Sequence, residues 1–311
     1  MRAPVGSIAV LVCTYRRPEL LADLLESLAA QRTSREFDVI VVDNDPAGSG
    51  REVAENAPIP VRYVVEPEPG IAAARNRSLD EAGDVDTVIF VDDDEIVVPD
   101  WLEALVATSE RSDADVVTGP VLAVLPPHAP RWIRRGGFHQ RRNLPEGTVL
   151  STAKSGNTLV RTRVLLGPPL ERFDAAFSRS GGSDTDLFWR LARQGARIVW
   201  SQGAVASEPV PDSRLTARWL VHREFRGGAA MGRMMLRDSP RAVVLAKGVV
   251  RTAVGAVRTL VGTVLNLGPR ASDTKVLLFG AGLVASVFGV RTDEYRRGPS
   301  ADPGTGQSPA P

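Results

Sequence analysis

The first hundred residues alternate between short, continuous apolar runs and longer stretches in which apolar residues recur at helical spacing. The apolar runs are Ile8–Cys13, Val39–Val42, Val61–Val65 and Val88–Val91. Leucines recur on one helical face of Glu19–Gln31, and Ile71–Glu81 has a second helical pattern. Runs of β-branched residues that alternate with helices are typical of a parallel sheet that is covered on both faces. The pattern therefore predicts an α/β fold.

The pattern changes after residue 115. Asp115–Leu125 is strand-like, whereas Pro126–Pro145 is rich in Pro, Arg and aromatic residues without clear periodicity. We expect this second stretch to be a loop that faces the substrate. Helical patterns dominate residues 213–297. Residues 298–311 contain Pro, Gly and Ser but no basic residue, a composition that predicts a disordered tail.

Polar residues stand at the carboxyl ends of the four apolar runs or in the helix that follows. They are Thr14-Tyr15-Arg16-Arg17, Asp43-Asn44-Asp45, Arg75-Asn76 and Asp92-Asp93-Asp94-Glu95. In parallel sheets, ligands bind outside the carboxyl ends of the strands. Any one of these segments alone is more often an ordinary polar turn. Together they predict one cleft in which carboxylates and arginines meet.

The acidic segment that begins at Asp92 indicates a cation. Four adjacent carboxylates repel one another, and they are tolerated when they are solvated or neutralised by a cation. Oxygen ligands suit Mg²⁺ or Mn²⁺, which keep several waters and bridge to substrate phosphates. A solvated acidic turn is the alternative. The position at a strand end beside basic residues favours the metal.

Taken in order, these segments resemble the family 2 glycosyltransferases of GT-A fold. Further along, Ser155-Gly156-Asn157, Gly181–Leu187 and Gly195–Ile198 fit the same family, and the similarity covers residues 7 to about 210. It extends through Arg214 and Trp219, as in bacterial members that build cell-surface polysaccharides. The resemblance implies a Rossmann-like mixed sheet flanked by helices. It also implies transfer of a sugar from a nucleotide-diphosphate donor to an acceptor hydroxyl.

The resemblance also implies how the chain is divided. Residues 1–212 would form the catalytic domain, with a nucleotide-sugar half at about 1–100 and an acceptor half at about 115–212. Residues 213–297 would form a helical C-terminal extension, followed by the tail.

The donor in this family is usually a uridine diphosphate sugar. The residues that the resemblance places around the nucleotide are Thr14, Tyr15, Arg17, Asp43, Arg75, Asp92 and Asp93. Asp94 would be the best single ligand of Mg²⁺ or Mn²⁺, with Asp92 beside it. The cation and nearby arginines would stabilise the negative charge of the leaving diphosphate.

The catalytic base implied by the resemblance is Asp184, at the start of a helix that spans Thr185–Arg193. It would take the proton of the acceptor hydroxyl in a single displacement that inverts the anomeric centre. A helix cap is the alternative, because a helix N-terminus stabilises a carboxylate. Ser183 replaces the acidic residue that the family usually has beside the base.

The acceptor side of the cleft is assigned to Asn157, Trp132 and Asp186. Glu208 stands near the point where many family members have a metal-contacting His. It either ligates the cation or pairs with Arg214 or Arg218, and the sequence favours neither. The acceptor is expected to be a glycan, a lipid-linked saccharide or a small molecule.

Charge is segregated along the chain. Residues 1–212 have 23 basic and 31 acidic side chains, whereas residues 213–297 have 15 basic and 5 acidic ones. On a helical wheel of Ala242–Leu265, the three basic residues Lys247, Arg251 and Arg258 lie within about 40° of one another. A narrow basic stripe on an apolar helix favours an anionic membrane surface. Packing on the catalytic domain and a dimer interface are the alternatives.

Other features of the chain bear on its location and partners. Its start has no signal-peptide pattern, and the apolar run Val276–Val290 is shorter than the about 20 residues of a membrane span. We therefore expect a cytoplasmic protein that binds the inner face of the membrane. Nucleic acid is disfavoured, because the arginines are not interleaved with aromatic residues and the acidic cleft repels phosphate in the absence of a metal. The oligomeric state is left open.

Two other functions compete with glycosyl transfer. A sugar-nucleotide nucleotidyltransferase would require a Gly-rich loop with a lysine after the first strand, and Thr14–Pro18 contains neither residue. A noncatalytic carbohydrate-binding domain of the same fold would show no dependence on metal.

Overall fold

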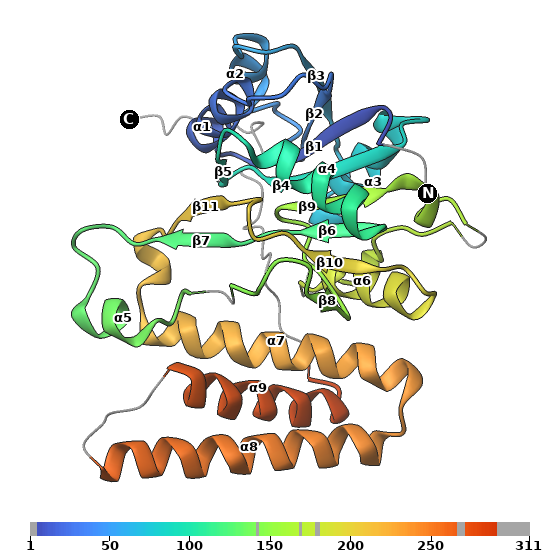
Figure 1. The fold of residues 1–311 in the computed structure, drawn as a ribbon. Coiled ribbons are helices and arrows are strands. Elements are labelled where there is room, and N and C mark those ends of the chain that lie inside the picture. Colours follow the sequence, from blue (N-terminus) through green and yellow to red (C-terminus); the bar gives the residue numbers. More distant parts are fainter. Residues whose placement is uncertain (1–4, 141–142, 168–169, 178–180, 266–270, 291–311) are drawn as a thin grey trace, which may run out of the picture.

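The computed structural model describes residues 5–140, 143–167, 170–177, 181–265 and 271–290, and its largest element is an eight-stranded sheet (Figure 1). The spatial order is β3 (Val61–Val65), β2 (Asp38–Asp43), β1 (Ile8–Thr14), β4 (Thr87–Asp92), β9 (Thr158–Arg161), β6 (Val116–Thr118), β10 (Ile198–Trp200) and β8 (Val149–Leu150). Neighbouring strands among the first four are parallel, as are β6 and β10. β9 runs antiparallel to both its neighbours, and β8 antiparallel to β10. The sheet is therefore mixed, as predicted.

Helices cover both faces of this sheet. One face packs against the leucines of α1 (Pro18–Ala29) and the apolar face of α4 (Trp101–Ser112). The other packs against α3 (Ile71–Ala82) and α6 (Ser183–Arg193). α2 (Arg51–Glu55) follows β2. The central strands β1, β2 and β4 are buried on both sides, which is why their sequences are continuous apolar runs.

The predicted strand at Asp115–Leu125 is divided between two sheets. Its first part is β6, and its second is β7 (Val121–Val124) in a three-stranded sheet with β11 (Ala206–Pro209) and β5 (Ile96–Val97). Pro120 separates the two parts and has no N–H for a ladder hydrogen bond.

The predicted loop at Pro126–Pro145 contains a short helix, α5 (Arg131–Gly136). The sequence shows no helical spacing of apolar residues here, because only Ile133 of this helix is buried and its neighbours are mostly arginines. Ile133 packs with Ala129, Val210 and Leu215 in a small separate apolar cluster.

The C-terminal region is a layer of three helices, α7 (Ala217–Asp238), α8 (Arg241–Val264) and α9 (Ala271–Val287). α9 lies between α7 and α8, so α8 is the outermost helix (Figure 1). Across the described part of the chain, every helix is too short or too polar to span a bilayer. The predicted disordered tail lies outside the described residues.

Candidate functional site

The carboxyl ends of β1, β2 and β4 meet at one edge of the sheet. Register fixes this, because Thr14 pairs with Asp43 on one side of β1 and Cys13 pairs with Asp92 on the other. The first residues of the acidic segment therefore lie next to the polar residues that follow β1. Together with residues from the small sheet and the segment that follows it, they form the strand-end cluster, which consists of Thr14, Arg17, Asp92, Asp93, Asp94, Glu208 and Arg214.

Asp93 connects β1 to the acidic segment. Thr14 donates its hydroxyl hydrogen to Asp93 Oδ2 at 2.8 Å, and Arg17 Nη1 lies 3.3 Å from Asp93 Oδ1. The side chain is buried, and burial raises the pKa of the Asp93 carboxyl, while Arg17 and Thr14 oppose the rise. Asp93 is therefore held in place by residues that precede and begin α1.

Asp94 lies between two arginines. Arg17 Nη1 is 3.1 Å from Asp94 Oδ2, and Arg214 Nη2 is 4.0 Å from the same oxygen. Burial raises the pKa of the Asp94 carboxyl to about 7, helped by the negative charges of Asp92, Glu208 and Asp93. Arg17 opposes this shift. A carboxylate in such a position gains from a nearby cation.

Arg214 extends the cluster to the small sheet. Its Nη1 contacts Glu208 Oε1 on β11, and its guanidinium lies 5.7 Å from the centre of the Trp219 ring. Glu208 thus pairs with Arg214, as one of the two predicted alternatives has it, and also lies close enough to Asp94 to raise its pKa. The result is a row of alternating charge, in the order Asp93, Arg17, Asp94, Arg214 and Glu208.

Asp92 is the open end of the acidic segment, with 44% of its side chain exposed. Arg75 Nη2 is 3.3 Å from Asp92 Oδ1, and the Arg75 guanidinium lies over the Phe173 ring at 5.5 Å. Gly156 backs onto the same carboxylate: a Cβ there would lie 2.8 Å from Asp92 Oδ2. A side chain at residue 156 would therefore displace the acidic turn.

Asp43 has a different place from the other predicted donor residues. Its side chain is fully buried. It accepts hydrogen bonds from the backbone N–H of Asp45 and of Gly50, and from the Tyr63 hydroxyl, at 2.7 to 2.8 Å. In this conformation Asp43 shapes the loop after β2. Tyr15 lies on the surface side of the same region, with the Arg16 guanidinium 5.1 Å from its ring centre.

Asp184 lies in the first turn of α6 and is partly buried. Its Oδ1 accepts from the backbone N–H of Thr185 at 2.7 Å. The segment before β9 connects this turn to the acidic segment: Thr152 Oγ1 is 3.3 Å from the Thr185 carbonyl oxygen, and Gly156 abuts Asp92. The first turn of α6 and the acidic turn thus both contact the segment 152–156.

The three residues predicted for the acceptor side differ in exposure. Asp186 is fully buried, with Arg190 at 3.0 Å and Arg237 at 2.7 Å, and burial raises the pKa of its carboxyl to about 6. Asn157 is also fully buried, has a φ of 60° and accepts from Trp101 Nε1 at 2.7 Å. Both side chains connect elements of the fold.

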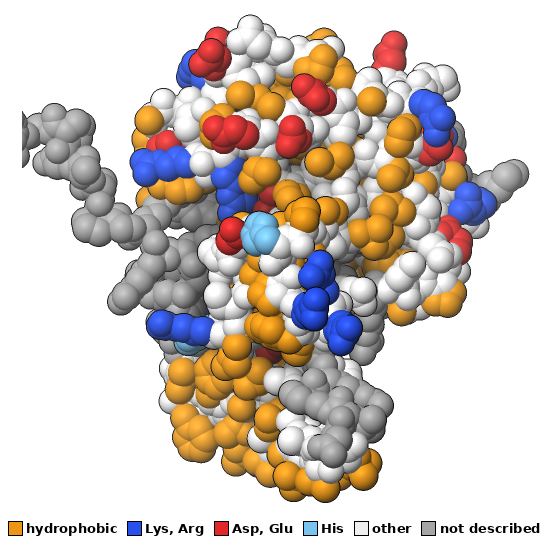
Figure 2. Space-filling model, turned by 90° about the vertical axis from the view of Figure 1, so that its left-hand side faces the viewer, with side chains coloured by type: hydrophobic (Ala, Val, Ile, Leu, Met, Phe, Trp, Pro, Cys, Tyr) orange, Lys and Arg blue, Asp and Glu red, His pale blue; other side chains and the backbone are white. Residues whose placement is uncertain are grey.

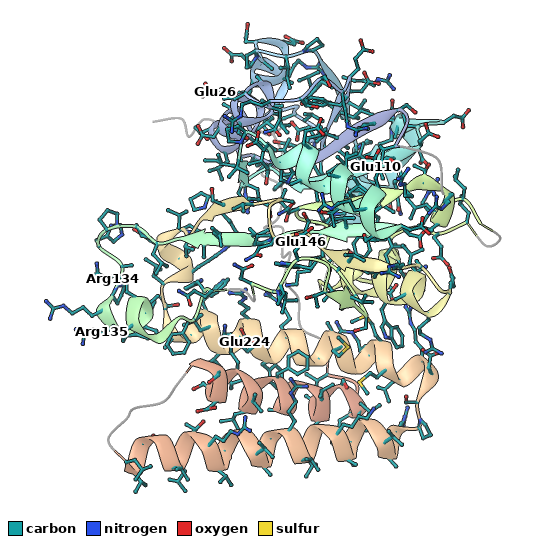
Figure 3. The ribbon with its side chains drawn as sticks, in the orientation of Figure 1. Glu26, Glu110, Arg134, Arg135, Glu146 and Glu224 are labelled. Carbon is teal, nitrogen blue, oxygen red and sulfur yellow. The ribbon has the colours of Figure 1, made fainter. Side chains whose placement is uncertain are left out.

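Only Trp132 of the three is exposed, at 45%. It packs edge-on against Phe138 at 5.5 Å. It lies on α5 with Arg134 and Arg135, at the end of the molecule away from α6 (Figure 3). A shallow cavity between α1 and α2, lined by Leu25, Glu26 and Val53, shares no residue with the strand-end cluster.

Sequence reasoning gave Arg214 no place among the site residues, although the family resemblance extended to it. The signal was its spacing of six residues from Glu208, across a proline-containing turn. That spacing became informative only when β11 was found beside β7 and β5, which places Glu208 next to Asp94.

The sheet order and the strand-end cluster define a GT-A fold, and solved structures share it. The crystal structure of S. aureus TarS matches with a TM-score of 0.55 at 16% identity, covering 90% of this chain and 55% of that chain. This chain thus spans about half of TarS. The structure of TarS 1-349 in complex with UDP-GlcNAc matches with a TM-score of 0.52 at 19% identity, over 91% of this chain and 92% of that one.

Sequence comparison gives the family. Residues 9–166 match the model of glycosyl transferase family 2, and the chain belongs to this family and is a glycosyltransferase. It is 40% identical to the succinoglycan biosynthesis protein ExoM of Rhizobium meliloti (strain 1021), over 72% of this chain and 74% of that protein. It is 27% identical to a glucosyl-dolichyl phosphate glucuronosyltransferase of Haloferax volcanii, over 71% of this chain and 75% of that protein.

Proposed function

We propose that this glycosyltransferase is inverting and metal-dependent, and that it transfers a sugar from a UDP-sugar to a hydroxyl group in polysaccharide biosynthesis. The acceptor would be a glycan or a lipid-linked saccharide, with a glycosylated small molecule as the less favoured case. The ExoM similarity supports polysaccharide biosynthesis. The UDP-GlcNAc complex of TarS supports a UDP-sugar donor, and the dolichyl phosphate relative supports a lipid-linked acceptor.

The row of alternating charge at the strand ends is the observation that carries this proposal. It brings three carboxylates and two guanidinium groups together where a parallel sheet binds ligands. A diphosphate can interact with both kinds of group. It accepts hydrogen bonds from arginine, and it can bind the same divalent cation as the carboxylates. Asp92, which precedes Asp93 in the chain, adds a carboxylate that is 44% exposed and therefore open to a ligand.

The carboxylates fit a divalent cation that the donor helps to bind. Within the described residues, no three His, Cys, Asp or Glu side chains form a ready-made metal site. Mg²⁺ commonly takes only one or two protein carboxylates together with substrate phosphates and water. Asp94 and Asp92 would supply these, because burial and neighbouring negative charges together raise the pKa of Asp94, and a cation would offset both. When bound, the cation supplies Lewis-acid stabilisation of the leaving diphosphate.

Arginines would hold the rest of the diphosphate charge. Arg17 and Arg214 each contact Asp94, and Arg75 contacts Asp92, so all three reach the carboxylates that would face the donor. As the bond between the anomeric carbon and the diphosphate breaks, its electron pair leaves with the diphosphate. Guanidinium groups already in place stabilise that charge without reorganisation.

Asp184 would act as the base. As the acceptor oxygen bonds to the anomeric carbon, the proton of the hydroxyl passes to the Asp184 carboxylate, in the turn that residues 152–156 connect to the acidic turn. Attack opposite the leaving group inverts the anomeric centre. We place this reaction at the inner face of the membrane, which the excess of basic residues in 213–297 supports.

The test is a panel of UDP-sugars measured by calorimetry with and without Mn²⁺. We expect one donor to bind tightly only with the cation, and Asp94→Asn to weaken that binding at least about tenfold, a scale that even outer partners of a metal reach. Asp100→Asn is the matched control, since Asp100 is exposed and pairs with Arg32 outside the cluster. Metal-independent binding in the wild type would refute the metal assignment, and binding of a saccharide alone would favour a noncatalytic domain.

A further inference from the structure

The outward face of α8 is apolar along the whole helix. Its most exposed large side chains are valines and leucines, with exposed fractions between 41% and 70%: Val243, Val249, Val250, Val254, Val257, Leu260, Val261 and Val264. Alanines fill the positions between them. Figure 2 shows hydrophobic side chains gathered over the end of the molecule where the C-terminal helices lie. A surface helix in water normally has polar residues on this face.

The inward face of α8 is made of small and hydroxylated residues. A Cβ at Gly255 would lie 2.3 Å from the backbone nitrogen of Leu277, and one at Gly248 2.8 Å from Val284 Cγ2, so α8 and α9 approach closely. Thr252 donates its hydroxyl hydrogen to the carbonyl four residues earlier, at 2.8 Å. Small residues at the helix contact and large apolar residues outside are the arrangement of helices that pack in lipid.

Charge on α8 has one sign. The helix contains Arg241, Lys247, Arg251 and Arg258 and no acidic residue. The last three lie along one flank, between the face that packs on α9 and the apolar face. Arg251 lies over the Phe279 ring of α9 at 4.7 Å. Long basic side chains on such a flank can reach lipid phosphates while the apolar face is buried.

We propose that α8 binds an anionic lipid bilayer, with its valine and leucine face in the boundary between headgroups and acyl chains and its basic flank among the phosphates. A second copy of this chain complements the surface less well, because its α8 would also present basic residues and no acidic ones. The proposal deepens the proposed function by naming the surface that meets the membrane. It rests on that function only for the location of the acceptor.

The first test is co-sedimentation of the full-length protein with vesicles of phosphatidylcholine and phosphatidylglycerol. We expect Val250→Asp/Val257→Asp to reduce binding at least about tenfold. Val149→Asp is the matched control, because Val149 and Val250 are both 62% exposed and Val149 lies on β8. Equal binding by the double variant and the wild type would overturn the proposal. So would a wild-type dimer, seen by sedimentation velocity without lipid, that the double variant dissociates.

The second test measures how much positive charge contributes to vesicle binding, and it substitutes only exposed basic residues. Lys247→Gln and Arg258→Gln should each weaken binding to the anionic vesicles about fivefold, the effect of one basic residue near such a surface. Vesicles of phosphatidylcholine alone should bind the wild type and both variants equally weakly. Equal binding of the wild type to neutral and anionic vesicles would overturn the assignment of anionic lipid.

Donor binding in the same variants separates this proposal from the proposed function. The α8 variants should bind a UDP-sugar with Mn²⁺ as the wild type does, since none of these residues belongs to the strand-end cluster. A protein that binds donor but no vesicles would refute only the membrane surface. A protein that binds vesicles but no nucleotide sugar would refute only the proposed chemistry.

Discussion

The strand-end cluster and the outer face of α8 depart in opposite ways from the usual distribution of polarity in a protein. In the cluster, the carboxyl groups of Asp93 and Asp94 are withdrawn from water, and both contact Arg17. On α8, valines such as Val250 are exposed to water although apolar side chains gain free energy by burial. Each arrangement is costly unless something else binds there. A nucleotide donor would complete the strand-end cluster, and a lipid surface would complete the outer face of α8.

Asp184→Asn should have the largest effect and would sharpen the functional side of this comparison. Without a carboxylate to take the proton, transfer should fall by about 10² to 10⁴. Donor affinity should be unchanged, because Asp184 contacts Thr185 and does not belong to the strand-end cluster. Single-turnover transfer and donor calorimetry measure the two quantities. Near-normal transfer would show that another residue is the base.

Asp186→Ala tests whether Asp186, the buried carboxylate two residues after Asp184, stabilises the fold and takes no part in the reaction. Removing it takes away the buried carboxylate that both arginines share, although Arg190 keeps Glu171 and Arg237 keeps Asp174 as partners, and the free energy of unfolding should fall by about 1–3 kcal/mol. Urea denaturation measures this. Asp238→Ala is the matched control on the same two helices: Asp238 pairs with Arg193, is 39% exposed, and should contribute at most about 1 kcal/mol. Equal losses in the two variants would refute the distinction.

Local sequence predicted the first half of the fold well. The strands at Ile8, Val39, Val61 and Val88 and the helices α1 and α3 follow from apolar runs and helical spacing, whereas the short helix α2 was not predicted. The division of 115–125 into β6 and β7 could not be predicted in this way. Which sheet each half joins depends on partners about 40 to 90 residues away in the chain.

The candidate site was predictable to the extent that its residues follow strands. Thr14, Arg17, Asp93 and Asp94 are adjacent to strand ends, and strand order brings them together. Sequence proximity to a strand end could not show that Asp43 points into its own loop rather than outward, since this depends on the backbone after β2. Nor could it show that α8 turns its valines outward, since the periodicity of a helix does not say which face packs.

Asp94→Asn should show how much the negative charge of Asp94 lowers the free energy of unfolding. The pKa of Asp94 rises from 3.8 in the unfolded chain to about 7, so the folded state binds the proton more tightly. Without divalent cations, the free energy of unfolding should therefore decrease as the pH rises from about 4 to about 7 and remain lower above that range. Asp94→Asn should flatten this profile and stabilise the cation-free protein by about 1–3 kcal/mol at pH 8.

Mn²⁺ provides the complementary measurement. It should raise the thermal midpoint of the wild type at pH 8 and leave Asp94→Asn unchanged, because ligand binding to the folded state stabilises it. Asp100→Asn, at an exposed carboxylate, should keep the wild-type pH profile and the response to Mn²⁺. If the free energy of unfolding of Asp94→Asn depends on pH as that of the wild type does, the Asp94 carboxylate does not destabilise the folded protein.

The smallest expected effect is that of Val250→Asp on stability in the absence of lipid. Val244 lies on the buried side of α8 and Val250 on its exposed side, with exposed fractions of 0% and 62%. Val244→Asp buries a carboxylate against α9 and should cost several kcal/mol, whereas Val250→Asp places it in water and should change the free energy of unfolding by less than about 0.5 kcal/mol. Urea denaturation of both variants measures the difference. A large decrease in the free energy of unfolding for Val250→Asp would mean that protein already covers this face, because a carboxylate is costly only where it is withdrawn from water. A negligible decrease would mean that the valines are exposed to water in the absence of lipid and are buried only when lipid is present.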